Sequence, residues 1–364
     1  MQRTSALLKQ EEVTAALRAR IAGGQYKTGE LIPPERTLAD EFQVARLTLR
    51  RALDPLIQEG MVVKVPGIGT RVTAAETAVS NGRSPWRVLG LLIPDFSNRF
   101  FIEVTEAVEY TALQRGYQLL LCNSRHDVGL EDWHLRQFAD RHVDGVVIAH
   151  DPYRELPRSL VQLEEASIPF VFLFATPAEA QFDTVALDDR SGVEELMKYL
   201  FSLGHRRIAF CRPNEGVNMH PREQAFRGIM ESAGLAIPAS FIIPLETLTH
   251  PRGPEILKRL FAGRNAPTAV FAGNDRTALL LLKQLVHLGI TVPDQVSVIG
   301  FDNLRFTEDL PVALTTVDQP KQDMGRRAVE LLLEKIELGR SNAPRNEIFR
   351  PRLVIRASCG VARV

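Results

Sequence analysis

From residue 33 to residue 58 the apolar positions follow the helical period twice, on either side of a tight turn at 43–45. The first predicted helix buries Leu38, Ala39 and Phe42 on one face. The second places its apolar side chains at Leu49, Ala52, Leu53, Leu56 and Ile57. Its opposite face carries Arg46, Thr48, Arg50 and Arg51. A short helix that is buried on one side and cationic on the other suits the major groove of DNA, although an ordinary surface helix with solvated arginines has the same pattern.

Strand-like sequence follows directly. Two β-branched runs, at 61–65 and 70–72, flank the turn Pro66-Gly67-Ile68-Gly69 and predict a β-hairpin. Upstream, residues 13–22 have a helical period that ends at Gly23-Gly24. Three helices followed by a hairpin predict a winged helix-turn-helix.

The pattern changes at residue 87, where continuous apolar runs begin to alternate with helical stretches. Strands buried on both faces are predicted at 88–93, 118–122, 145–149, 169–174, 207–211, 268–272 and 296–300. Helices are predicted at 101–115, 131–141, 222–234 and 278–289, with another ending at residue 203. This alternation predicts a doubly wound parallel sheet, and its restart after Asp188 predicts two similar lobes. Such lobes bind ligands in the cleft between them, at the carboxyl ends of the strands.

Composition changes this picture little. The 364 residues have a formal net charge of zero, so the argument for nucleic acid rests on the local excess of arginine and lysine in the first segment. Three widely spaced cysteines argue against a disulfide framework or a zinc site and favour a reducing compartment. No apolar run reaches transmembrane length, so we expect a soluble, cytoplasmic protein without a membrane partner. Residues 75–86 are small and polar, as in a linker.

Residues 14–72 resemble the DNA-binding domain of the GntR family of bacterial regulators. The matching positions are Pro33, Glu35, Arg36, Leu38, Ala39, Val44, Arg46, Thr48, Arg50, Ala52, Leu53, Glu59, Gly60, Gly67, Gly69 and Thr70. The resemblance implies that Arg36 holds a phosphate and that Arg46, Thr48 and Arg50 reach bases or phosphates. It also implies that Gly69 lets the wing approach the minor groove.

Five positions depart from the GntR pattern. Ala45 and Pro34 stand where serines usually cap the two helices, so a capping hydrogen bond worth about 1 kcal/mol is absent at Ala45. Leu47 replaces a polar residue and is expected to meet a thymine methyl group. Ile68 replaces a common basic residue of the wing. Pro55 lies inside the second helical pattern, where it predicts a kink or an early end.

Residues 87–358 resemble the effector domain of the LacI/GalR regulators and the related periplasmic sugar-binding proteins. The matching motifs occur in order at 94–101, 143–145, 203–208, 273–275, 292–302, 314–317 and 319–320. The resemblance implies an effector site formed by Asn98, Phe100, Phe101, Asn274, Asp302 and Gln319. The phenylalanine rings would face apolar sugar surfaces, and the carboxylate and amides would satisfy hydroxyl groups, which need partners of either sense.

The effector-clamping arginine of this family stands three residues before the glycine that we match to Gly228, and that position is Ala225 here. Arg222, about one turn earlier on the same helix face, is the candidate to replace it. Arg99 stands where proline is usual, and Phe174 stands where some sugar-responsive members have an acid. His150 and Asp151 end a predicted strand and are further candidates, although a solvated loop fits them equally.

These observations together predict an α/β protein with an N-terminal winged helix-turn-helix and a two-lobed, doubly wound periplasmic-binding-protein-like domain. The expected boundaries are 1–74 for the DNA-binding domain, 75–86 for the linker and 87–364 for the effector domain. Within the effector domain, the first lobe takes about 87–187 and 319–344, and the second takes 188–318 and 345–358.

The predicted function is that of a ligand-responsive transcriptional regulator. Because most members of the families it resembles repress transcription, we expect a repressor. Its partners would be operator DNA, a small sugar-like effector and a second copy of the chain, because two heads must meet two half-sites. A purine-responsive regulator, and a sugar-binding module that acts through protein contacts without DNA, are the alternatives. No catalytic triad, metal-ligand spacing or phosphate-binding loop is present, so neither an enzyme nor a cofactor is expected.

Overall fold

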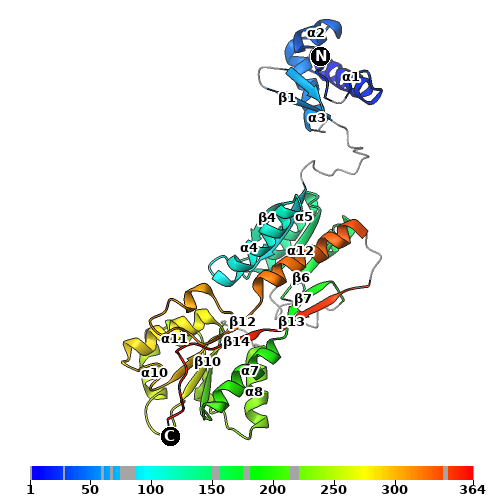
Figure 1. Cartoon of the computed structure of the whole chain (residues 1–364). Helices are drawn as coiled ribbons and strands as arrows, with labels where there is room; N and C mark the ends of the chain where they lie inside the picture. Colours follow the sequence, from blue (N-terminus) through cyan, green and yellow to red (C-terminus); the bar gives the residue numbers. More distant parts are fainter. Residues whose placement is uncertain are drawn as a thin grey trace. The chain divides into compact units, whose positions relative to one another are not determined.

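The computed structural model describes residues 2–27, 29–58, 61–65, 69–73, 87–149, 156–174, 181–213, 221–338 and 343–363. The chain divides into two units, Met1–Pro85 and Trp86–Val364 (Figure 1). The predicted linker 75–86, the wing residues 66–68 and the candidates His150 and Asp151 lie outside the described residues. Over the described part of the chain, no helix is long and apolar enough to cross a membrane.

The first unit is built from three helices and one hairpin. These are α1 (Gln2–Ala22), α2 (Glu35–Glu41), α3 (Arg46–Gln58), β1 (Val62–Val65) and β2 (Gly69–Val72), with β1 and β2 antiparallel. Their apolar faces form one core. It contains Val13, Leu17, Ile21, Ile32, Leu38, Ala39, Leu49, Ala52, Leu53, Leu56, Val62 and Val72. The order and packing are those of a winged helix-turn-helix.

Three of the departures from the GntR pattern can be followed here. Pro34 precedes α2 and its side chain makes no capping hydrogen bond. At the start of α3 the carbonyl of Ala45 accepts hydrogen bonds from the N–H groups of Thr48 and Leu49 at 2.8 and 3.1 Å. Pro55 does not end α3, which continues to Gln58. The predicted early end is therefore wrong, because the buried side chains on both sides of the proline hold the helix in the core.

The first lobe of the second unit contains a six-stranded parallel sheet in the order β13-β7-β6-β5-β3-β4. Its strands are β3 (Val88–Ile93), β4 (Gln118–Asn123), β5 (Gly145–Ile148), β6 (Phe170–Leu173), β7 (Thr184–Leu187) and β13 (Asn346–Phe349). Successive residues of a strand point to opposite faces, and here both faces are covered. Leu91 packs on one side and Leu92 on the other. This double burial explains the continuous apolar runs in the sequence.

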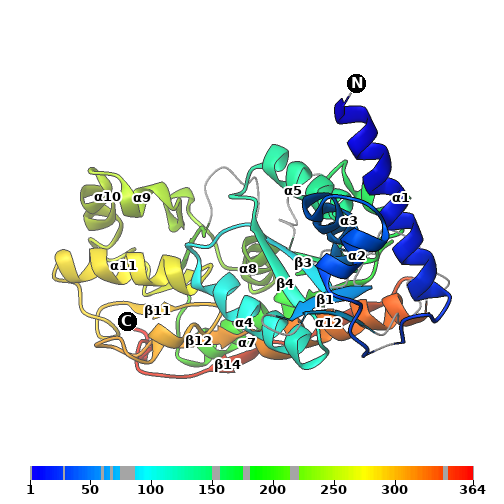
Figure 2. The same ribbon diagram turned by 90° about the horizontal axis from the view of Figure 1, so that it is seen from above.

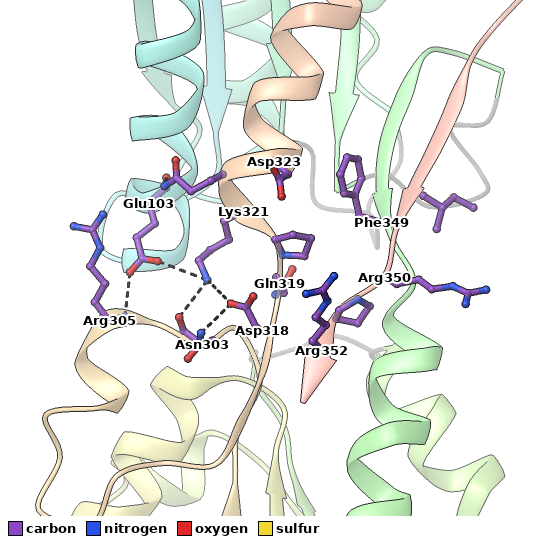
Figure 3. Close-up of a pocket in the computed structure, with 14 residues that line it drawn as sticks. Glu103, Asn303, Arg305, Asp318, Gln319, Lys321, Asp323, Phe349, Arg350 and Arg352 are labelled. Carbon is purple, nitrogen blue, oxygen red and sulfur yellow. Dashed lines mark hydrogen bonds and ion pairs between the residues drawn. The ribbon is translucent and has the colours of Figure 1, made fainter. Parts of the chain in front are cut away.

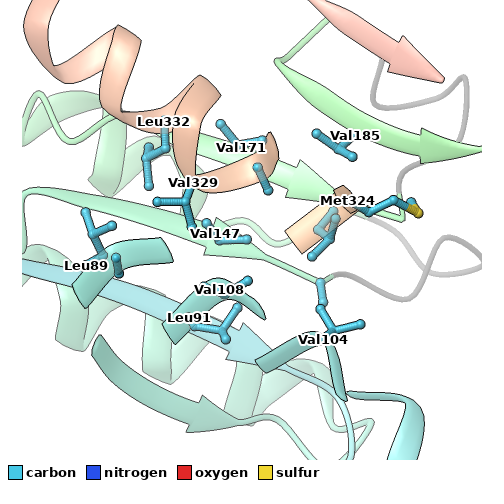
Figure 4. Close-up of a cluster of buried hydrophobic side chains, with 14 of the residues drawn as sticks. Leu89, Leu91, Val104, Val108, Val147, Val171, Val185, Met324, Val329 and Leu332 are labelled. Carbon is cyan, nitrogen blue, oxygen red and sulfur yellow. The ribbon is translucent and has the colours of Figure 1, made fainter. Parts of the chain in front are cut away.

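Helices α4 (Arg99–Gln114) and α12 (Lys321–Leu338) cover one face of this sheet, and α5 (Val128–Asp140) and α6 (Leu160–Glu165) cover the other. Although they are two hundred residues apart in the chain, α4 and α12 lie side by side (Figure 1 and Figure 2). Figure 4 shows the core that they close, where valines and leucines from the sheet meet side chains from both helices. The first lobe is therefore completed by a C-terminal helix.

The second lobe has a four-stranded parallel sheet in the order β11-β10-β8-β9. Its strands are β8 (Ile208–Cys211), β9 (Ile242–Ile243), β10 (Ala269–Ala272) and β11 (Ser297–Ile299). One face packs against α7 (Asp189–Ser202) and α8 (Pro221–Ser232), and the other against α10 (Gly253–Leu260) and α11 (Asp275–His287). A short helix, α9 (Glu246–Thr249), joins this second group.

The chain passes between the lobes three times. The crossings follow β7, link β12 (Thr316–Asp318) to α12, and link β13 to β14 (Arg352–Val354). Strand β13 hydrogen-bonds to β7 of the first lobe, so the assignment of residues 345–349 to the second lobe is wrong. The cause is that β13 is a half-exposed edge strand, without the apolar run by which the other strands were recognised.

The packing of α4 on α12 generates a stability prediction. A Cβ added at Gly325 of α12 would lie 2.8 Å from the Cβ of Ala107 and 3.2 Å from the carbonyl oxygen of Val104. We expect Gly325→Ala to lower the free energy of unfolding by about 1–3 kcal/mol, because the two helices must separate. Gly228→Ala on α8, where an added Cβ meets nothing within 4 Å, should raise it by about 0.5–1 kcal/mol. Urea denaturation of both variants measures the difference, and changes of the same sign would contradict the packing described.

Candidate functional site

The cationic face predicted on the recognition helix is present in the structure. Helix α3 buries Leu49 and its apolar neighbours, while Arg46 and Arg50 are exposed and Thr48 is half-buried. Leu47 is 60% exposed on the same helix. Arg36 of α2 is also exposed. The predicted DNA-contacting side chains of α3 therefore share the solvent side of one short helix.

An acid of α2 organises part of this surface. Glu35 accepts a hydrogen bond from Arg50 Nη2 at 3.0 Å and pairs with Lys64 Nζ at 2.8 Å. Its bonds to Lys64 and to Arg50 lower the pKa of the Glu35 carboxyl below its ordinary value. Lys64 stands on strand β1, so this one carboxylate connects the second helix, the recognition helix and the wing. In the sequence, Glu35 is only one of the positions that match the GntR pattern, and no role is predicted for Lys64.

Gly69, at the start of β2, has a φ of 138°, a conformation that L-residues with a side chain rarely adopt. It is exposed, so the wing has a backbone segment that can approach another molecule closely. The predicted role of Gly69 agrees with this geometry.

In the second unit, three of the predicted effector residues meet directly. The Oδ1 atom of Asp302 accepts hydrogen bonds from Gln319 Nε2 at 2.5 Å and from Arg222 Nη1 at 3.3 Å. All three side chains are buried, Asp302 to 3% exposure. They come from β11, from the crossing after β12 and from α8, so distant parts of the chain converge on one carboxylate.

Arg222 is held on several sides. Its Nε donates to Asp189 at 2.7 Å, its Nη1 donates to the carbonyl of Gly273 at 2.8 Å, and its guanidinium lies 3.7 Å from the ring centroid of Phe301. The structure thus places Arg222 beside Asp302, and Ala225 packs against the core of α7 and α8. Of the two possibilities left by the sequence, the geometry favours Arg222 as the arginine of this site.

The two predicted asparagines cap helices. Asn98 Oδ1 accepts from the N–H of Phe100 at 3.1 Å at the start of α4, and Asn274 Oδ1 accepts from the N–H of Thr277 at 2.9 Å at the start of α11. In the part of the chain that the structure describes, no partner is found for the Nδ2 group of either residue. Both amides can therefore cap a helix and still donate to a ligand.

The predicted aromatic wall is a three-ring cluster. The ring centroids of Phe100 and Phe101 are 5.3 Å apart, and Phe174 lies 4.8 Å from Phe100 and 6.5 Å from Phe101. Phe100 is buried in the core of the first lobe, whereas Phe101 and Phe174 are half-buried at its edge. Phe101 and Phe174 are thus better placed to contact a ligand than Phe100.

A second carboxylate, missed by the sequence reading, lies next to Asp302. Asp275 is fully buried, and its oxygens accept from Thr316 Oγ1 at 2.6 Å and from the N–H of Leu304 at 2.8 Å. Burial and the nearby charge of Asp302 raise the pKa of Asp275 well above its ordinary value. Burial also raises the pKa of Asp302 to about 6, although Arg222 and Lys321 oppose this rise. The position of Asp275, directly after Asn274 in a matched motif, was its only signal.

Comparison with known proteins agrees with both units. A family model for bacterial regulatory proteins of the gntR family matches residues 9–72, and a model for a periplasmic binding protein-like domain matches residues 197–359. The arabinose metabolism transcriptional repressor of Geobacillus stearothermophilus is 30% identical over 346 residues, which cover 93% of this chain and 94% of that protein. The chain belongs to the same family of GntR/LacI-type transcriptional repressors.

Some other relatives match about three quarters of this repressor. The HTH-type transcriptional repressor PurR of Vibrio vulnificus is 32% identical over 273 residues, covering 74% of this chain and 80% of that protein. The crystal structure of a LacI family transcriptional regulator from Enterococcus faecium with bound ribose is 28% identical, with a TM-score of 0.64 over 76% of this chain and all of that chain. The repressor is therefore a ligand-responsive DNA-binding protein with a GntR-type head and a LacI-type body.

The raised pKa of Asp302 predicts a pH dependence of stability. Because the folded repressor holds this proton more tightly than the unfolded chain, its stability should fall as the pH rises from about 4 to above 6, by about 1.4 kcal/mol for each pH unit between the two pKa values. Asp302→Asn removes the titrating group, so its free energy of unfolding should change less between about pH 5 and about pH 7.5 in urea denaturation. Asp309→Asn, at an exposed position, is the control and should keep the slope of the unmodified protein. Equal slopes for all three would contradict the burial argument.

Proposed function

We propose that this repressor binds operator DNA as a homodimer through α3 and the wing, and that a small neutral sugar in the cleft beside Asp302 weakens that binding. The observation that carries the proposal is the pairing of a buried carboxylate with a buried guanidinium, Asp302 with Arg222. Such a pair offers an acceptor and donors within one site, which is what a hydroxyl group needs. The repressor named for arabinose metabolism and the neighbour with bound ribose support the same class.

Charge balance favours a neutral ligand over a phosphorylated one. Among the described residues, the cations of this cluster are Arg222, which contacts Asp189 and Asp302, and Lys321, which faces Glu103 and Asp318. Both cations already contact carboxylates, so a further anion would be poorly compensated in a buried site. A purine base is the second candidate effector, and the three-phenylalanine cluster favours it because aromatic rings stack on planar bases. We assign no catalytic step to the site.

The homodimer is supported by one face of α4. Ile102, Tyr110 and Leu113 are all exposed there, Tyr110 to 63%, and their spacing places them on one side of the helix. A row of exposed large apolar side chains on a helix marks an interaction surface. A second copy of the chain is the occupant that the function requires, because two heads are needed for two half-sites.

The DNA-binding part is tested with a duplex that the unmodified protein selects from a random library. Arg46→Ala and Arg50→Ala should each weaken binding by about 1–3 kcal/mol if the side chain reads a base. If the side chain contacts a phosphate instead, its removal should reduce the slope of log affinity against log salt concentration by about one. Arg190→Ala, which removes an exposed, ion-paired arginine from the effector unit, is the matched control and should leave DNA affinity unchanged. Unchanged binding by both α3 variants would contradict the assigned surface.

The effector part is tested by thermal shift with D-ribose, L-arabinose and hypoxanthine. A probe present at about a hundred times its dissociation constant should stabilise the repressor by about 2.7 kcal/mol. Asp302→Asn should lose this stabilisation, and the exposed-site control Asp309→Asn should keep it. Operator DNA should weaken probe binding by the same factor by which the probe weakens DNA binding, because coupling is reciprocal. A probe Kd that is identical with and without the duplex would rule out the proposed switch.

A further inference from the structure

Lys321 is a buried lysine, 6% exposed, at the first position of α12, where the chain crosses from the second lobe to the first. Its Nζ atom donates hydrogen bonds to the carbonyl oxygens of Asp302 and Asn303, the latter at 3.2 Å. Figure 3 shows the side chain reaching down from α12 towards Asn303 and Asp318. A buried ammonium group is stable only with several acceptors, and Lys321 takes two of them from the loop that carries the Asp302 carboxylate.

The same ammonium group also pairs with an acid of its own lobe. Glu103 of α4 places its Oε2 atom 3.6 Å from Lys321 Nζ, and its Oε1 atom accepts from the N–H of Arg305 at 3.3 Å. The guanidinium of Arg305 pairs with Glu106, one turn along α4, at 2.8 Å. Asp318, at 3.9 Å, is the remaining acid facing Nζ in the described part of the chain. Lys321 and Glu103, both on helices of the first lobe, therefore hold the 302–305 loop that follows β11 of the second lobe.

The loop between these contacts is conformationally strained. Asp302 has a φ of 117° and Asn303 a φ of 51°, and such values are unusual for residues with side chains. Leu304, the residue after Asn303, is buried in the first-lobe core together with Phe100 and Val104. The segment 302–305 thus begins at the effector carboxylate and ends against α4. Strained backbone of this kind persists only where the surrounding groups hold it, and the Lys321 ammonium holds two of its carbonyls.

Lys321 also lies on the wall of a cavity of about 910 Å³ at this crossing. The cavity is lined by the crossing from β12 to α12, by the crossing from β13 to β14, and by Glu103, Asn303, Arg305 and Asp318 (Figure 3). Since the lobes are not close-packed here, the side-chain bridge, rather than a filled core, connects them at this point.

We propose that Lys321 is a positioning residue: it fixes the Asp302 loop and, through Glu103, transmits the state of the effector site to helix α4. This inference rests on the proposed effector role of Asp302. It assigns separate tasks to the two partners, because Lys321 acts on both Asp302 and α4, whereas Glu103 acts only on the connection between them.

The first experiment needs no effector. Hydrogen–deuterium exchange is compared for the unmodified full-length protein, Lys321→Met and Lys335→Met. Lys335 stands on the same helix and pairs with Asp183 away from the crossing, so its variant is a matched loss of one lysine ion pair. Lys321→Met should make the amides of residues 302–305 and of the first turn of α4 exchange roughly tenfold faster, and Lys335→Met should not change them. Unchanged exchange in Lys321→Met, or equal changes in both variants, overturns the proposal.

The second experiment measures coupling with the selected duplex and the same three probes. Glu103→Gln should keep the probe Kd within about threefold of the unmodified value, while the factor by which the probe weakens DNA binding falls from roughly tenfold towards one. Full coupling in Glu103→Gln overturns the proposed transmission. If none of the probes changes DNA affinity of the unmodified protein, the effector assignment fails, and the exchange experiment still decides the role of Lys321.

Discussion

Parallel strands bring all of their carboxyl ends to one edge of a sheet, and the effector unit of this repressor depends on that constraint. Asn274 follows β10 and Asp302 follows β11, in each case after a glycine. A Cβ on Gly273 would lie 2.7 Å from Pro213, and one on Gly300 would lie 2.2 Å from Asp275. The chain can therefore turn at the ends of these two strands only because Gly273, directly before Asn274, and Gly300, two residues before Asp302, have no side chains. The sheet order fixes which residues meet, and the glycines allow them to come close enough.

The sequence was sufficient to predict features that depend on the pattern of buried positions along the chain. It was insufficient to predict features that arise where side chains from distant segments meet. Continuous apolar runs predicted β3, β4, β5, β6, β8, β10 and β11, and the structure confirms the doubly wound fold, but β7 and β9 were not predicted. The edge strand β13 has no such run and was assigned to the wrong lobe. Asp302 could be predicted because it lies in a recognisable motif. Lys321 could not, because its role arises from contacts with the carbonyls of Asp302 and Asn303 and with Glu103, which is more than two hundred positions away.

Arg222 shows the limit of reasoning from spacing along a helix. Counting back from Gly228 pointed to Ala225, which packs in the core of the second lobe, while the guanidinium that reaches Asp302 is one turn earlier. The two positions lie on similar faces, and only the acceptors decide between them. Asp189, the carbonyl of Gly273 and Asp302 surround Arg222 from three elements. A guanidinium presents donors in a rigid fork, so several fixed acceptors hold it in one orientation, as a ligand site requires.

The energies involved make the Asp302 loop suitable for switching. Each residue held in a sparsely populated backbone region costs on the order of 1–3 kcal/mol, and coupling between sites in allosteric proteins is also about 1–3 kcal/mol. A ligand that changes how firmly the loop at Asp302 and Asn303 is held therefore acts on an energy of the size that regulation needs. The exposed Glu35–Arg50 pair of the DNA-binding unit is different, since ion pairs in contact with solvent contribute little to stability. DNA can displace that pair cheaply, so sensitivity to the effector must originate in the buried loop rather than in the reading surface.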